Sequence, residues 1–383
     1  MTTYSAVVTT GIYCRPGCGA RPKASNTRTF ELAAAAEAAG FRACLRCRPY
    51  RVAGPVPLGA PELVCQAVQM IIYGALDDGG TEAGLAERAG VSARHLRRLF
   101  LQHLGATPDQ LARSRRAHFA RRLLDDTDLT AADIAFASGF GSLRQFNRAM
   151  QEVFRASPTD LRRRRHRADR LIADGGLALR LPVLPGYDWA QVRSGLAARA
   201  VPGVAVVDGD TYRRTITVGG AAGLLEVAPG EPGDLVLRLH LPYWEGLIHL
   251  VGRIARLLGA DDDQRPGLAG PGAWTPFEAG VLDIAGQGRD AAAAARWLGS
   301  FAARLGPPVP GLPGGLTHAF PEPGAVTLSR LASAGIGSAE ARAIEALAVA
   351  SLAVPGGLLP GGAVPVLQEQ IAEVTGPYRE GAA

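Results

Sequence analysis

Four of the five cysteines lie in two close pairs near the start of the chain. Three residues separate Cys14 from Cys18, two separate Cys44 from Cys47, and 25 residues lie between the pairs. Four thiolates from two turns satisfy the tetrahedral preference of Zn²⁺, and a closed set of four cysteines is typical of a structural zinc site. A pair of disulfides is the alternative, which the low cysteine content of this long chain disfavours. We therefore expect one Zn²⁺ on these four residues.

The overall composition indicates several globular domains. At 383 residues, 47% of them hydrophobic and 20% charged, the chain has apolar material for about two to four packed cores. Its longest uncharged stretch, residues 346–367, contains Pro355, Pro360 and Pro365, which would break a membrane-spanning helix. We expect no membrane span, no signal peptide and a cytoplasmic protein.

The texture of the sequence changes along the chain. A Gly/Pro-rich stretch follows the cysteines, helical periodicity runs to about residue 165, short strands follow, and Ala-rich helices close the chain. The predicted fold class is multidomain α+β, with a small Cys₄ zinc domain, an all-α double helix-turn-helix domain, an α/β domain like the TATA-box protein, and a truncated all-α domain. The predicted bounds are 1–52, 61–165, 177–258 and 270–383.

Basic residues are concentrated in the first part of the chain. Residues 1–170 hold 26 Lys and Arg against 15 Asp and Glu, whereas residues 171–383 hold 15 against 20. This asymmetry predicts a polyanionic partner for the first part. The arginine run 162–167 has two interpretations, a solvated helix end or a phosphate contact.

Residues 85–100 (LAERAGVSARHLRRLF) carry the pattern of a helix-turn-helix unit. Gly90 supplies the turn and Ser92 is the N-cap of the second helix. The buried face of that helix is predicted to comprise Leu96, Leu99 and Phe100. The remaining side chains, which face outward, are Arg94, His95, Arg97 and Arg98.

Residues 134–148 (IAFASGFGSLRQFNR) repeat this design. Gly139 is at the turn, Ser142 and Gln145 are predicted to form a capping box, and Phe146 packs inward. The outward side chains are Arg144, Gln145 and Arg148.

A helix from Thr107 to about Leu124, roughly 25 Å long, would join the two units so that both recognition helices reach successive major grooves. With LGATP at 104–108 and FRASP at 154–158, the pattern resembles the AraC-type DNA-binding domain. That resemblance implies double-stranded DNA as partner. The alternative is a helical bundle with arginine-rich solvent faces. The candidate DNA-binding residues here are Ser92, Arg94, His95, Arg97, Arg98, Ser142, Arg144, Gln145 and Arg148.

Residues 9–18 (TTGIYCRPGC) and 39–49 (AGFRACLRCRP) closely resemble the methyl-accepting zinc domain of the bacterial Ada adaptive-response regulator. The resemblance implies that Cys14 is the catalytic residue, which takes a methyl group irreversibly from a methylphosphotriester in DNA. It implies that the other three cysteines complete the zinc site. The chemistry is coherent because a zinc-bound thiolate is nucleophilic at neutral pH. The family has a helix and a strand before this motif, whereas eight residues precede Thr9 here.

Basic residues surround the cysteines in the sequence. Arg15 and Arg21 fall at positions of the Ada motif that are expected to face phosphates. Arg42, Arg46 and Arg48 are expected to add to the same basic surface.

The C-terminal half resembles the AlkA-type 3-methyladenine DNA glycosylase. Residues 179–182 (LRLP), 187–189 (YDW) and 212–215 (YRRT) match its N-terminal α/β domain, while 271–278 (PGAWTPFE) and 315–321 (GLTHAFP) continue into its helical catalytic domain. Such glycosylases flip an alkylated base and use an Asp beyond a helix-hairpin-helix motif.

The match decays toward the end of the chain. At the expected hairpin position only Gly376, Pro377 and Tyr378 remain, and no residue supplies the glycosylase Asp. We therefore expect a truncated domain that has lost glycosylase activity. The aromatic residues of this half are interpreted as core side chains, with a base pocket as the alternative: Tyr187, Trp189, Tyr243, Trp244 and Trp274.

Three functions remain from these patterns. The favoured one is a single-turnover DNA-methylphosphotriester methyltransferase that regulates transcription, with alkylated and promoter DNA, and also RNA polymerase, as partners. The second is an alkylbase glycosylase in base excision repair, against which the missing Asp argues. The third is a non-enzymatic zinc-containing DNA-binding regulator, against which Cys14 in its motif argues.

Overall fold

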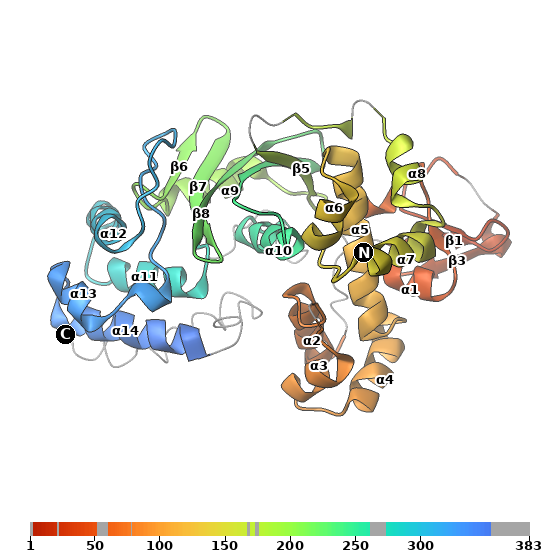
Figure 1. Ribbon diagram of the computed structural model, residues 1–383, viewed down its shortest axis with the longest axis horizontal. Coiled ribbons are helices and arrows are strands. Elements are labelled where there is room, and N and C mark those ends of the chain that lie inside the picture. The colour runs from red at the N-terminus through yellow and green to blue at the C-terminus, as the bar shows by residue number, and fades with distance from the viewer. Residues whose placement is uncertain are drawn as a thin grey trace.

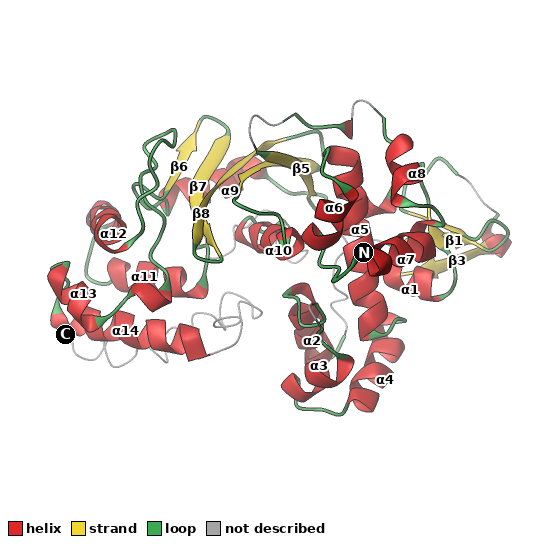
Figure 2. Cartoon of the chain, viewed as in Figure 1, coloured by secondary structure: helices red, strands yellow, loops and turns green. Residues whose placement is uncertain are grey.

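The computed structural model describes residues 3–20, 23–51, 60–77, 79–166, 169–172, 176–260 and 273–353. Figure 1 shows an elongated molecule in which a small sheet at one end is followed by a helical block, a larger sheet and a second group of helices. Figure 2 shows that strands occur in two separate places, with helices between and beyond them. The multidomain α+β organisation that the sequence predicts is therefore present.

A four-stranded sheet forms the N-terminal unit. Its strand order is β3-β1-β2-β4, with β1 antiparallel to both β2 and β3, and β2 parallel to β4. β1 lies within the eight residues before Thr9. The elements are β1 Tyr4–Val7, β2 Ile12–Cys14, η1 Ala24–Asn26, β3 Thr27–Phe30, α1 Ala33–Ala38, β4 Arg42–Ala43 and η2 Pro49–Arg51.

Helices α2 to α8 form the helical block. Their bounds are α2 Glu62–Ile72, α3 Glu82–Arg88, α4 Ala93–Leu104, α5 Pro108–Asp126, α6 Ala131–Ala137, α7 Leu143–Phe154 and α8 Pro158–Arg163. The long α5 starts with a complete capping box between Thr107 and Gln110 and with a proline in its first turn. It contacts α1, α2, α6, α7 and α8, so it is the axis of this part of the molecule.

The turns of both helix-turn-helix units form as predicted. Gly90 and Gly139 have φ of 71° and 78°, the left-handed region that favours glycine. Ser92 accepts a hydrogen bond from the N–H of His95, which starts α4, and Ser142 does the same for Gln145 at the start of α7.

The predicted capping box at Ser142 is incomplete. The side chain of Gln145 is exposed, with its Oε1 beside Gly141, and the described structure records no bond from it back to the Ser142 N–H. The complete box of this unit is formed by Thr130 and Asp133 at the start of α6 instead.

A five-stranded antiparallel sheet follows, in the order β5-β9-β8-β7-β6. A two-residue turn joins β7 to β8, and its residues, Gly219 and Gly220, have φ of 56° and 81°, the positive values that a tight hairpin turn of this type requires. The elements are β5 Leu177–Pro182, α9 Trp189–Ala198, β6 Ala205–Asp208, β7 Thr211–Val218, β8 Ala221–Pro229, β9 Asp234–His240 and α10 Leu247–Leu257. α10 lies between this sheet and the helical block (Figure 1).

The last described elements are helical: α11 Pro276–Gly286, α12 Ala291–Leu305, η4 Pro323–Ala325, α13 Leu328–Ser333 and α14 Ser338–Ala353. A buried ion pair ties this group to the sheet. Arg214 on β7 donates to Glu278 on α11 at 2.8 Å, and both side chains are almost fully buried. The Arg214 guanidinium also lies over the ring of Trp274, 5.5 Å from its centroid.

Within the described residues, no helix combines the length and the apolar character that crossing a lipid bilayer demands.

Removal of one partner of the Arg214–Glu278 pair should destabilise the C-terminal half. Glu278→Gln leaves a buried guanidinium without its counter-charge, and breaking such a pair costs about 3–5 kcal/mol. All four tryptophans lie between Trp189 and Trp297. Urea unfolding followed by tryptophan fluorescence therefore measures the stability of this half.

Asp208→Asn is the matched control for this measurement. Asp208 pairs with Arg213 at 2.8 Å, but its side chain is largely exposed, so its loss should cost below about 1 kcal/mol. Equal destabilisation by the two substitutions would contradict the role of the buried pair.

Candidate functional site

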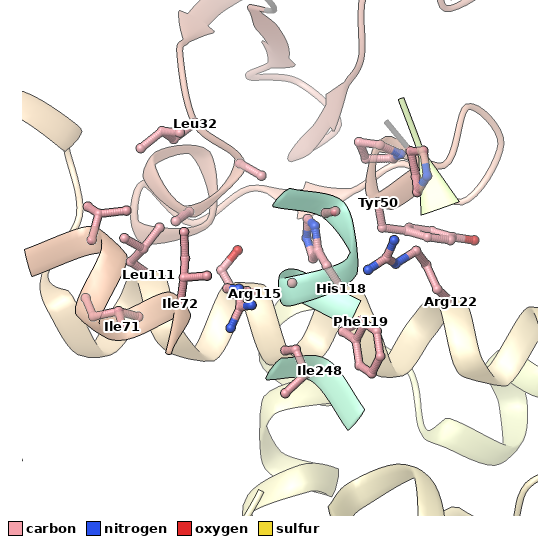
Figure 3. Close-up of a pocket in the computed structure, with 18 of the residues that line it drawn as sticks. Leu32, Tyr50, Ile71, Ile72, Leu111, Arg115, His118, Phe119, Arg122 and Ile248 are labelled. Carbon is pink, nitrogen blue, oxygen red and sulfur yellow. The ribbon is translucent and has the colours of Figure 1, made fainter. Parts of the chain in front are cut away.

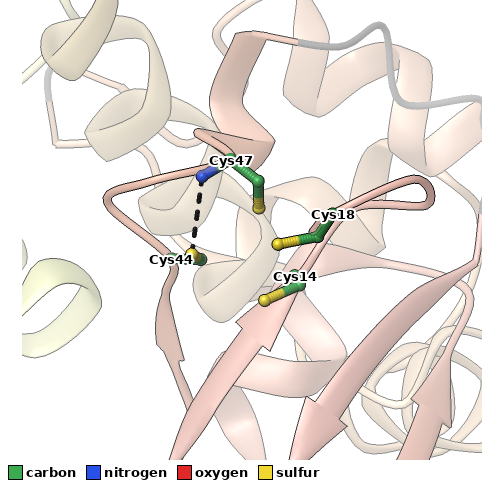
Figure 4. Close-up of side chains that lie close together, drawn as sticks. All are labelled: Cys14, Cys18, Cys44 and Cys47. Carbon is green, nitrogen blue, oxygen red and sulfur yellow. Dashed lines mark hydrogen bonds between the residues drawn. The ribbon is translucent and has the colours of Figure 1, made fainter. Parts of the chain in front are cut away.

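The small N-terminal sheet brings the two cysteine pairs together. Its parallel strands β2 and β4 are in register, with Tyr13 opposite Ala43, and each strand delivers a cysteine at its carboxyl end. The backbone N–H of Cys44 donates to the carbonyl of Tyr13 at 3.0 Å, which places Cys44 beside Cys14. The second cysteine of each pair returns to the same place on a tight turn (Figure 4).

The geometry of this cluster fits a tetrahedral metal. The sulfur atoms of Cys14, Cys18, Cys44 and Cys47 all lie within 4.8 Å of one another. Sulfurs at the Zn–S distance of about 2.3 Å in a tetrahedron would be about 3.8 Å apart, which these positions accommodate. No disulfide joins any of the five cysteines. The described thiols therefore form the predicted four-cysteine set and not a pair of disulfides.

Without a cation, the cluster does not favour four thiolates. Burial raises the pKa of the Cys14 thiol far above its ordinary value, and the neighbouring Cys44 and Cys47 raise it further. Burial also raises the pKa of Cys47, to about 12. The pKa of Cys44, in contrast, is lowered: burial opposes this, but the backbone N–H groups of Cys47 and Arg46 outweigh it. A divalent cation supplies the positive charge that such a donor set requires.

The basic residues predicted around the cluster have different surroundings. Arg15 and Arg46 are exposed, whereas Arg42 is half-buried and donates to the carbonyl of Ala43. Arg21 lies outside the described residues. The prediction for Arg48 is wrong: its side chain turns inward and pairs with Asp169 at 2.7 Å.

The outward-facing residues of α4 and α7 lie as predicted. Phe146, Leu96 and Phe100 are fully buried, and Leu99 is half-buried. Arg97 pairs with Glu82 at 3.4 Å and Arg148 with Glu152 at 2.9 Å, both near the surface. His95 and Ser142 are half-buried. The exposed residues are Ser92, Arg94, Arg97, Arg98, Arg144, Gln145 and Arg148.

Comparison with known proteins identifies three segments of the chain. Residues 2–50 match the metal binding domain of Ada, residues 85–164 match a helix-turn-helix domain, and residues 178–274 match the AlkA N-terminal domain. The probable bifunctional transcriptional activator/DNA repair enzyme AlkA of Mycobacterium tuberculosis is 38% identical over 344 residues, which cover 82% of this chain and 68% of that protein. The chain belongs to this family.

Other members and structures match shorter parts of this AlkA-family chain. The bifunctional transcriptional activator/DNA repair enzyme Ada of Escherichia coli is 33% identical over 150 residues, 39% of this chain and 40% of that protein. A solved 3-methyladenine DNA glycosylase from Archaeoglobus fulgidus aligns with a TM-score of 0.38 and 19% identity over 44% of this chain and 66% of that chain. The Ada match and the cysteine geometry together establish a zinc site in this member of the family.

The sequence patterns did not predict the role of two acidic residues in this family member. Asp125 and Asp126, in the last turn of α5, are buried and bind side chains from other elements. Tyr50 donates to Asp125 at 2.8 Å, and Arg180 on β5 donates to Asp126 at 2.9 Å. Arg51 reaches both carboxylates at 3.4 Å. One feature of the sequence could have indicated this role. Two acidic residues at the C-terminus of a helix are disfavoured by the helix dipole unless nearby cations compensate their charge.

The two carboxylates of α11 have different surroundings. Glu278 is held by Arg214 in the core, and Asp283 is exposed on the helix surface. Trp274, interpreted from the sequence as a core side chain with a base pocket as the alternative, is buried under the guanidinium groups of Arg214 and Arg253. Residues 374–378, where the sequence places the remains of the hairpin, lie outside the described residues.

Loss of one cluster cysteine should release the metal. Cys44→Ser removes one of four thiolates from a closed set, so the purified protein should fall from one equivalent of zinc to far below one. Metal content is measured by inductively coupled plasma mass spectrometry on the full chain.

Cys65→Ser is the control for this substitution. Cys65 lies on α2, and its thiol donates to the carbonyl of Ala60, outside the cluster. The control should keep one equivalent of zinc. Full zinc retention in Cys44→Ser, or equal loss in both variants, would refute the four-cysteine site.

Proposed function

We propose that this protein accepts a methyl group from DNA methylphosphotriesters onto Cys14 and binds DNA as a transcriptional activator. The observation that carries the proposal is the four-cysteine cluster within the segment that matches the metal binding domain of Ada. The helix-turn-helix match and the bifunctional relative support the regulatory half. An activator acts on RNA polymerase, and we include that partner in the proposal.

We assign this function to four units along the chain. Residues 1–52 are the methyl-acceptor unit, 61–165 the DNA-binding unit, 177–258 the AlkA-like α/β unit and 270–383 the glycosylase-like helical unit. Base excision is not part of the proposal, because the described residues of α11 hold Glu278 in an ion pair rather than at a base site.

In the proposed reaction, the Cys14 sulfur attacks the methyl carbon. A sulfur–carbon bond forms, the bond from that carbon to the phosphotriester oxygen breaks, and its electron pair stays on the oxygen, which leaves an ordinary phosphodiester. Zinc bound to the four cysteines keeps the sulfurs deprotonated at neutral pH. The product thioether is a poor leaving group, so each protein molecule reacts once.

Cys14 is less exposed than two of the other cluster cysteines, although it is the proposed methyl acceptor. Its side chain is 7% exposed, whereas Cys18 and Cys47 are half-buried. Accessibility alone would favour one of the latter two, so the choice of Cys14 rests on its match to the first cysteine of the Ada motif. Arg15, which is exposed and next to Cys14 in the chain, is the proposed contact for the phosphate of the lesion.

Methyl transfer also changes the charge beside the DNA. A thioether carries one negative charge fewer than the thiolate, so repulsion between the cluster and the phosphates falls. We propose Arg15, Arg21 and Arg42 as phosphate contacts in this unit. For the recognition helices α4 and α7, we propose as DNA contacts Ser92, Arg94, His95, Arg97, Arg98, Ser142, Arg144, Gln145 and Arg148.

Incubation with methylphosphotriester DNA should add one methyl group per molecule, at Cys14. Peptide mass spectrometry maps the adduct and gives its stoichiometry. Cys65→Ser should react like the wild type, and Cys14→Ser should not react. Zinc content is measured in parallel so that loss of the fold is recognised. A methyl group on Cys18, Cys47 or Cys65, or none at all, would reject the assignment of Cys14.

Substitution of the recognition-helix arginines should weaken sequence-specific DNA binding. Arg144→Ala and Arg97→Ala should each cost about 1–3 kcal/mol if these side chains contact base edges. A specific DNA site is first obtained by selecting tight binders of the wild-type protein from random duplexes. Fluorescence anisotropy then measures the affinity of each variant for this site and for random duplex DNA at one fixed salt concentration.

Arg296→Ala is the control for these two variants. Arg296 is exposed on α12, in the C-terminal group of helices, so it should leave DNA affinity unchanged. An equal loss of affinity for operator and random DNA would reduce Arg97 and Arg144 to phosphate contacts.

A further inference from the structure

A cavity of about 290 Å³ lies where three parts of the chain meet. Its lining comes from α1 and η2 of the N-terminal unit, α2 and α5 of the helical block, and α10 beside the larger sheet. Figure 3 shows Arg115, His118 and Arg122 spaced along α5 in this region, with Leu32 on one side and Ile248 on the other. The proposed methyl transfer and DNA contacts use none of these residues.

The walls of the cavity are mainly apolar. Val68 and Ile71 contribute from α2, Leu111 from α5, and Ile248 and Val251 from α10. A volume of this size equals that of about ten liquid waters, at about 30 Å³ each. Such a lining favours an organic molecule with an apolar body over water or a bare ion.

Arg115 contributes a poorly compensated positive charge to this cavity. Among the described residues its guanidinium has no recorded hydrogen bond and no ion pair, although the residue is only partly exposed. Burial lowers its pKa to about 10; Asp77 opposes this, and the neighbouring Arg256, Arg122 and Arg116 lower it further. Asp77 is itself bound by Arg116 and by His249, so it is not a dedicated partner for Arg115.

The backbone of α10 leaves space for this guanidinium. Gly252 faces it, and a Cβ at that position would lie 3.2 Å from Nη2 of Arg115. Arg122, the other cation of the cavity, has different surroundings. Like Arg115, it has no ion pair among the described residues, but its guanidinium lies 5.1 Å from the centroid of the Phe119 ring, and two carboxylates, Asp126 and Asp234, favour its charge. An anionic ligand group would therefore be stabilised more by Arg115 than by Arg122.

We propose that this cavity binds a small amphipathic carboxylate of about ten non-hydrogen atoms. Its carboxylate pairs with Arg115, and its apolar body lies against the side chains of α2, α5 and α10. Because the walls come from three parts of the chain, a bound molecule stabilises their docked arrangement. The cavity is thus an effector site between the methyl-acceptor, DNA-binding and AlkA-like units.

Octanoate is the probe, since it has eight carbons and two oxygens. Isothermal titration calorimetry on the full zinc-loaded chain should show saturable binding of one octanoate per molecule. Octan-1-ol, which lacks the charge, and acetate, which lacks the apolar body, should bind much more weakly. Arg115→Met should weaken octanoate binding about ten- to a hundredfold, since it removes a charge-assisted hydrogen bond. Arg296→Met is the matched control and should bind octanoate like the wild type.

Circular dichroism shows whether Arg115→Met is folded. If it is not, two further variants test the same contact. Arg115→Lys keeps the charge and should retain most of the affinity, whereas Gly252→Ala crowds the guanidinium and should reduce it. Absence of saturable octanoate binding would overturn the proposal. Binding of octanol as tight as that of octanoate, or octanoate binding unchanged in Arg115→Met, would overturn it as well.

Discussion

The carboxylates at the C-terminal end of α5 hold the units of this chain in one arrangement. Two acids in a last helical turn are opposed by the helix dipole, and their burial adds a desolvation cost. Arg51 from η2, Arg121 from α5 and Arg180 from β5 supply the compensating charge, so three parts of the chain must be present together. Burial raises the pKa of Asp126 despite hydrogen bonds and charges that oppose it. The cluster therefore contributes a defined geometry more than a net gain in stability.

A second contact joins the cysteine cluster to the same helix. Tyr13, which precedes Cys14 on β2, donates to Glu37 at 2.6 Å, and its hydroxyl lies 3.0 Å from Nε2 of His118 on α5. Around these polar contacts, one continuous apolar core includes side chains of the small sheet, of α5 to α7 and of the larger sheet. The first helix-turn-helix unit has a core of its own. The cysteine cluster is thus more firmly joined to the second unit than to the first.

Local patterns in the sequence predicted the elements of the fold well. The turns at Gly90 and Gly139 and the long helix α5 form where the sequence predicts them, because glycine conformation and helix propensity act over short distances. The four-cysteine cluster followed from spacing alone. Arg48 was misplaced on the basic surface because its partner, Asp169, is remote in the sequence. The ion pair of Arg180 with Asp126 and the cavity beside Arg115 were likewise invisible, since both depend on how separate units dock.

The cysteine cluster is packed against α5 through Tyr13 and His118, and this fixed position determines how methylation would act on DNA binding in the proposed function. At physiological ionic strength, screening confines the direct effect of one charge to about 8 Å. The charge lost at Cys14 therefore acts mainly on phosphates that lie within about 8 Å of the cluster. In the proposed function, sequence preference is assigned to the recognition helices and dependence on the lesion to the cluster. Their free energies add on one duplex because the cluster, α5 and α7 are packed together, so that DNA held by one surface is presented to the other in a single register.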